Sequence, residues 1–182
     1  MPYIKVLYEA IKLKALLPSS DMKYYRVGRL SNDEINLIKK YFNQKKVNST
    51  GVNVFTRAFI CFLKSKDEAK CFLNCHLKKN MNKVLYTLEQ DRNLDYNSVS
   101  YMDMHDISFY GNEEEVLFFP FSSFEIREIK EKTYNQEKIY EIDLLYLGSN
   151  VNNIDNKNKK SVDDFQIIKN WDDKSQIDEL KK

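Results

Sequence analysis

Three consecutive glutamates, Glu113 to Glu115, run directly into the apolar segment 116–119, which Pro120 ends. Valine, leucine and phenylalanine favour a buried strand, and proline closes one. Because side chains on a strand alternate between faces, Glu113 and Glu115 would point to one side and Glu114 to the other. Two residues of strand rise would separate that pair by roughly 6.5–7 Å. At this distance one carboxylate can hold a sugar while the other prepares an incoming nucleophile. A solvated turn is the alternative interpretation of the triplet, and the residues upstream weigh against it.

Composition limits the class of protein. The chain of 182 residues is long enough for one buried core and a tail, and 42% hydrophobic with 13% aromatic residues indicates a globular domain. The 29 basic and 27 acidic residues leave a net charge of +2, too small to imply a nucleic-acid partner. The aromatic residues alternate as strand core residues and do not interleave with a basic stripe, which also disfavours nucleic acid. Neither a Walker A loop nor a G-x-G-x-x-G motif is present, so any nucleotide must be held in another way.

Cysteine usage and apolar runs suggest where the protein resides. The three cysteines are an odd number without framework spacing, so we expect a reduced intracellular protein, cytoplasmic by preference. Cys71, Cys75 and His76 offer too few ligands with too little support, and we expect no metal. No window approaches eighteen consecutive apolar residues, and the N-terminus lacks the apolar core of a signal peptide. We therefore expect no membrane partner.

Helices are predicted first and strands afterwards. Apolar spacing predicts a helix over about 2–17, and two capping boxes, Ser31 with Glu34 and Ser65 with Glu68, open helices that run to about 42 and 76. Strands are predicted over 23–28, 53–63, 83–89, 98–102, 105–109, 114–119, 123–131 and 138–147, with a hairpin turn over 134–137. This order predicts an α+β domain over 1–148 with a mainly antiparallel sheet. A polar linker over 149–161 and a helical tail over 162–182 would follow.

Three segments of the chain together resemble one known family. They are the run Tyr-Arg-Val-Gly-Arg-Leu over 25–30, the strand-like run 55–63 followed by Ala69 and Phe72, and the run from Glu113 through Pro120 to Phe124. The chain from about 2 to 147 resembles the arginine-modifying mono-ADP-ribosyltransferases. Their marks are a Tyr-Arg-Gly strand, a Phe-Leu-Ser-Thr-Ser strand and a Glu-x-Glu-Val-Leu segment followed by Pro, Ser and Phe. The resemblance implies an ADP-ribosyltransferase-like fold, in which two small mainly antiparallel sheets form a cleft for NAD+, preceded by N-terminal helices.

The resemblance also assigns roles to residues. Arg26 would bind the phosphates of NAD+, since a guanidinium pairs with phosphate oxygens and keeps its charge. Glu115 would be the catalytic carboxylate that stabilises positive charge on the ribose as nicotinamide leaves. Glu113 would orient and help to deprotonate an acceptor guanidinium. Tyr110 would contact the protein substrate.

The chain departs from the family pattern at the strand that should read Ser-Thr-Ser. By alignment on Ala69 those positions are Cys61, Phe62 and Leu63, and Cys61 offers a much weaker donor than serine. Val27 stands where the family has glycine and adds a Cβ near the expected nicotinamide amide, while Gly28 follows it. The resemblance implies that Val27, Gly28 and Cys61 line the NAD+ site. Family members also carry further helices before the segment that resembles 2–17.

Two functions follow as expectations. The first is an NAD-dependent protein mono-ADP-ribosyltransferase, arginine-directed and of reduced activity, with NAD glycohydrolase action when water replaces the acceptor. The alternative is a catalytically inactive module of the same fold that binds a protein partner or NAD+. NAD+ is expected as co-substrate, a protein arginine as acceptor, and no metal as cofactor.

Overall fold

A computed structural model describes residues 22–47, 52–56, 58–74, 81–90, 101–104, 114–120 and 122–149. The predicted helix over 2–17, the predicted strand over 105–109, and the predicted linker and tail beyond Ser149 lie outside these residues.

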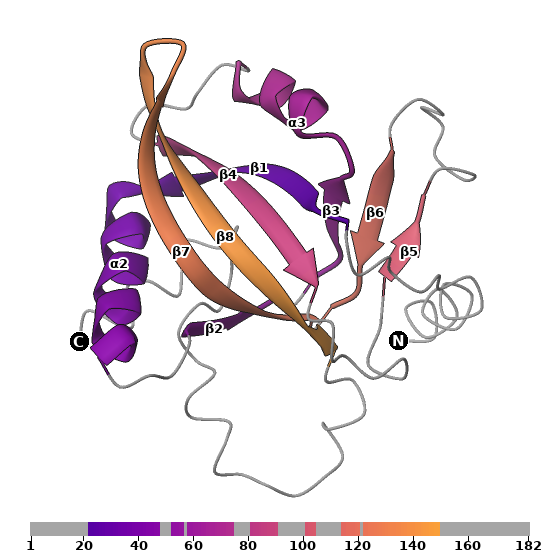
Figure 1. Ribbon diagram of the computed structural model, residues 1–182, viewed down its shortest axis with the longest axis horizontal. Coiled ribbons are helices and arrows are strands. Elements are labelled where there is room, and N and C mark those ends of the chain that lie inside the picture. The colour runs from indigo at the N-terminus through magenta and orange to yellow at the C-terminus, as the bar shows by residue number, and fades with distance from the viewer. Residues whose placement is uncertain are drawn as a thin grey trace, which may run out of the picture.

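The described residues form helices and strands in the order that Figure 1 shows. The two helices cover different parts of a sheet, and the longest strands form a twisted hairpin (Figure 1). The elements are β1 (Tyr24–Ser31), α2 (Asn32–Val47), β2 (Val52–Phe55), β3 (Ile60–Leu63), α3 (Lys66–Leu73), β4 (Met81–Gln90), β5 (Tyr101–Asp103), β6 (Glu115–Phe118), β7 (Ser122–Tyr134) and β8 (Glu137–Ser149).

The strands pair in the order β2-β7-β8-β4-β1-β3-β6-β5. All the pairs are antiparallel except β4 with β8. The ladder between β1 and β3 consists of one residue pair, Tyr25 with Leu63. The sheet therefore consists of two subsheets, one with the strand order β2-β7-β8-β4-β1 and one with the order β3-β6-β5. They are joined only by the pair of Tyr25 with Leu63. This arrangement confirms the predicted α+β class with a mainly antiparallel sheet.

The two faces of the sheet bury different sets of side chains. The inner face carries the main core, in which the ring of Phe118 contacts the rings of Tyr24, Phe62, Tyr101, Phe124 and Tyr146. Two residues of α2, Ile35 and Ile38, belong to this core. The outer face carries a smaller cluster in which Leu63 and Leu85 pack with Ala69 of α3. The face on which a candidate residue lies therefore determines which of these two clusters it adjoins.

The structure confirms the helix starts and the hairpin turn that short-range patterns in the sequence predict. At the start of α2 the Ser31 N–H donates to Glu34 Oε2 at 2.6 Å, and the Glu34 N–H donates to Ser31 Oγ at 3.2 Å. Ser65 caps α3 by accepting from the Glu68 N–H at 3.3 Å. The turn between β7 and β8 contains two residues with positive φ, Asn135 and Gln136. Such side-chain caps and turn conformations depend on neighbouring residues only.

The prediction of one strand over 53–63 is wrong. The segment forms two strands, β2 and β3, which pair with β7 and β6 respectively. Between them the Thr56 hydroxyl donates to the Ala58 carbonyl at 2.8 Å, and such a short-range bond competes with a continuous strand. Composition alone could not reveal the break, because both halves are rich in β-formers.

Candidate active site

Arg26 lies where the two subsheets separate. One guanidinium nitrogen, Nη1, donates to the Cys61 carbonyl of β3 at 3.0 Å. The antiparallel register would next place Arg26 opposite Phe62, but the ladder stops at Tyr25 and Leu63. The side-chain bond therefore replaces main-chain pairing just beyond the last pair, and it ties β1 to β3 across the gap.

Cys61 and Glu115 lie on the two paired strands β3 and β6. Cys61 pairs with Leu117, and Leu63 pairs with Glu115, so all four side chains share the outer face and Cys61 is diagonal to Glu115. Burial raises the pKa of the Cys61 thiol, and the Glu115 carboxylate raises this pKa further, while the Arg26 guanidinium acts in the opposite direction. Both charges are thus close enough to act on one thiol.

The candidate carboxylate and guanidinium approach this point from opposite faces. Strand alternation directs Arg26 to the inner face with Tyr24, whereas Glu115 shares the outer face with Leu63. Their common neighbour is Cys61, beside the gap between β1 and β3. A ligand that contacts both groups must therefore lie at this gap.

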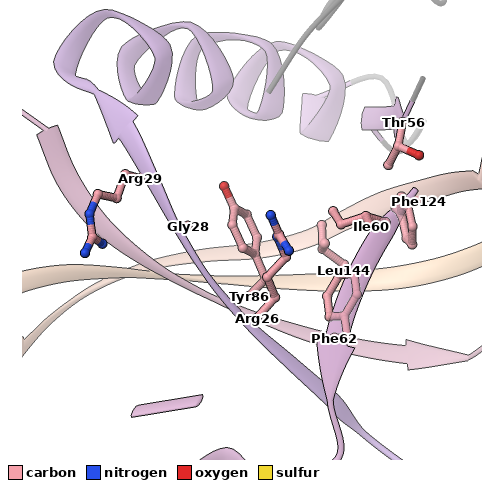
Figure 2. A pocket seen from close by; sticks show the side chains of 9 residues that line it. All are labelled: Arg26, Gly28, Arg29, Thr56, Ile60, Phe62, Tyr86, Phe124 and Leu144. Carbon is pink, nitrogen blue, oxygen red and sulfur yellow. The ribbon is translucent and has the colours of Figure 1, made fainter. Parts of the chain in front are cut away.

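A pocket on the inner face adjoins Arg26 (Figure 2). Its polar lining comprises Arg26, Arg29, Thr56 and Tyr86, and its apolar lining includes Phe62. The pocket is small, about 40 Å³, and its Phe62 and Tyr86 rings are buried, so its contribution to a binding site is the guanidinium of Arg26, which suits an anion. In the sequence, Arg29 is marked only by its place in the Tyr-Arg-Val-Gly-Arg run. Thr56 and Tyr86 carry no signal of their own, because only the strand pairing brings them here.

Gly28 and Val27 have packing roles in β1. A Cβ added to Gly28 would lie 2.8 Å from Cε2 of Tyr86, so glycine makes room for this buried ring. Figure 2 shows the Tyr86 ring beside the Arg26 side chain, as their pairing across β1 and β4 requires. Val27 faces outward and packs on the cluster of Leu63, Ala69 and Leu85.

Two predicted site residues, Glu113 and Tyr110, lie outside the described residues. Glu114, the neighbour of the candidate carboxylate, is exposed, while Glu115 is partly buried. Over the described residues, no group of three or more His, Cys, Asp or Glu side chains could hold a metal ion. Neither described helix is long and apolar enough to cross a membrane.

Comparison with solved structures identifies the fold. The Vis toxin of Vibrio splendidus, an ADP-ribosyltransferase, matches with a TM-score of 0.56 at 20% identity, over 82% of this chain and 58% of that one. The ADP-ribosyltransferase toxin Plx2a of Paenibacillus larvae matches with a TM-score of 0.55 at 15% identity, over 81% of this chain and 70% of that one. A domain of Salmonella SpvB matches with a TM-score of 0.51 at 16% identity, over 81% of this chain and 71% of that one. No family model and no curated protein sequence matches the chain.

The chain therefore has the ADP-ribosyltransferase fold, as the sequence resemblance predicts. It spans less than two thirds of the length of the Vis structures, 58–59%. One of those Vis structures contains agmatine and another an inhibitor.

Proposed function

We propose that the protein is an NAD-dependent mono-ADP-ribosyltransferase that modifies arginine side chains. The observation that carries this proposal is the meeting of Arg26, Cys61 and Glu115 at the gap between β1 and β3. A guanidinium and a carboxylate that both act on Cys61, from opposite faces of the sheet, match the two ends of the reacting part of NAD+, its phosphates and its nicotinamide ribose.

The proposed reaction exchanges one bond at the ribose for another. The bond between C1′ of the ribose and the nicotinamide nitrogen breaks, and neutral nicotinamide leaves with the bonding electrons. Positive charge develops on the ribose, and the Glu115 carboxylate stabilises it. An acceptor guanidinium nitrogen then bonds to C1′ and loses a proton, for which Glu113 is the proposed base. When water takes the place of the acceptor, the products are free ADP-ribose and nicotinamide.

Arg26 contributes charge and position in this scheme. Its guanidinium can bind phosphate oxygens through the nitrogen atoms that Cys61 does not occupy, since five N–H groups are available on one arginine. Arg29, three residues further along β1, also lines this pocket, but its guanidinium points away from that of Arg26 (Figure 2).

Arginine as the acceptor rests on two observations. The paired glutamates of the sequence, Glu113 and Glu115, supply the negative charge that a guanidinium requires. The Vis structure with agmatine shows that a protein of this fold binds a small guanidinium compound.

Transfer of labelled ADP-ribose from NAD+ to agmatine tests the proposal. We expect transfer by the wild-type protein and a loss of at least about a hundredfold in Glu115→Gln, which keeps shape but removes the charge. Glu114→Gln is the matched control, because its exposed side chain points away from Glu115. Equal transfer by wild type and Glu115→Gln would remove the claim.

The inactive module makes a different prediction for the same assay. It predicts no nicotinamide release at any enzyme concentration, because the Cys61 thiol is a much weaker hydrogen-bond donor than the serine hydroxyl of the family pattern. Nicotinamide that accumulates in proportion to the amount of protein would exclude this alternative.

A further inference from the structure

Lys64, the residue after β3, contacts both ends of the connection between β5 and β6. Its main-chain N–H donates to the Glu114 carbonyl at 2.9 Å. Its ammonium lies 2.5 Å from Oδ2 of Asp103. Asp103 ends β5 and Glu114 precedes β6, so one residue is bonded to the chain on both sides of this connection.

The side chain of Lys64 crosses the beginning of β6. In the sheet β6 lies between β3 and β5, and the lysine reaches from the end of β3 to the end of β5. Alternation after Phe62 places Lys64 on the inner face, and Asp103 shares that face with its paired residue Val116. The ion pair therefore lies under the strand whose first residue, Glu115, points outward.

This ion pair is shielded more than the exposed pairs of the molecule. The side chains of Lys64 and Asp103 are 18% and 23% exposed, against 54% and 53% for Lys23 and Glu89. Water and salt screen a shielded pair less, so its attraction is stronger than that of a surface pair. A main-chain bond from the Met104 N–H to the Glu115 carbonyl, at 2.8 Å, closes the same end of the ladder.

We propose that Lys64 is a positioning residue that sets the place of Glu115. It fastens the end of β5 and the start of β6 to β3, so the catalytic carboxylate is held from the opposite face of its own strand. Lys64 touches neither NAD+ nor acceptor in this account and transfers no proton. The effect on catalysis depends on the proposed transferase function, whereas the effect on the strand ends does not.

Hydrogen exchange tests the structural half of the proposal. Lys64→Met removes the ammonium and keeps the main-chain N–H, so the Met104 and Lys64 amides should exchange about tenfold faster. Lys64→Arg, which retains the charge, should stay within about twofold of wild type. Lys23→Met, which breaks an exposed pair, is the matched control and should leave both amides unchanged.

Kinetics test the catalytic half. Lys64→Met should lower kcat for nicotinamide release by about tenfold, with KM for NAD+ changed by less than about twofold, because a displaced Glu115 stabilises the transition state less. Asp103→Asn should have the same effect, and the double variant should be no worse than either single one, since both remove one interaction.

Each result has a separate meaning. If wild-type protein releases no nicotinamide, the proposed function fails while the exchange measurement still decides the role of Lys64. The positioning role is overturned if the Met104 amide exchanges in Lys64→Met as it does in Lys23→Met. It is also overturned if Lys64→Arg loses as much activity as Lys64→Met.

Discussion

At the scale of single residues, the pKa of the Cys61 thiol depends on the charges around it. Its thiol has a raised pKa because it is partly buried and because Glu115 is nearby, while Arg26 opposes the shift. The thiol is therefore protonated at neutral pH and should react slowly. In the proposed transferase, the weak S–H donor at this position is the physical reason to expect reduced turnover.

Alkylation of Cys61 by iodoacetamide gives a test that needs no enzymatic activity. Glu115→Gln removes a charge that raises the thiol pKa, so the pKa should fall and alkylation at a fixed pH below it should become a few-fold faster. Arg26→Met removes a charge that lowers the pKa, so alkylation should become slower. Mass spectrometry separates Cys61 from the exposed Cys71, which should not change. A shift of Cys61 in the same direction in both variants would show altered access and contradict the charge account.

Gly28 makes a second prediction at this scale. An added methyl group would approach Cε2 of the buried Tyr86 ring to 2.8 Å, so Gly28→Ala should cost about 1–3 kcal/mol of the free energy of unfolding. Tyr86→Val should relieve the overlap, and the double variant should lose less than the two single losses combined. Denaturant unfolding measures each term. A Gly28→Ala protein as stable as wild type would show that packing against Tyr86 is not why glycine is present.

At the scale of elements, the sequence predicts helix starts correctly, because they depend on neighbouring residues. It does not predict which strands pair with one another. The capping boxes at Ser31 and Ser65 could be predicted because each is a bond between residues three apart. The break between β2 and β3 was missed because each strand pairs with a partner far away in the sequence. The same limit hid Lys64, whose importance depends on where Asp103 lies.

Helix α3 offers a prediction for an element. Ser65→Ala removes the N-cap and should cost about 1 kcal/mol of the free energy of unfolding. Since α3 covers Leu63 and Val27 on the outer face, nicotinamide release should also fall. Ser31→Ala is the matched control: it should cost a similar free energy at α2, which packs on the inner face, with less effect on release. Equal loss of release in both variants would contradict a specific role for α3.

At the scale of the whole molecule, the candidate active site results from the way in which the two subsheets meet. The α+β class and the resemblance to ADP-ribosyltransferases were available from the sequence, through the Arg26 run and the glutamate triplet. That Arg26 faces the inner side and Glu115 the outer side was not, because this depends on strand register. Nor could sequence reveal that β1 and β3 share one residue pair, which leaves the gap beside Cys61.

A crystal structure of Glu115→Gln with NAD+ tests this arrangement most directly. The account predicts one dinucleotide at the gap between β1 and β3, with its phosphates on the Arg26 guanidinium and its nicotinamide ribose beside the side chain at 115. A dinucleotide bound elsewhere, or one that touches Arg26 and leaves residue 115 out of reach, would contradict it.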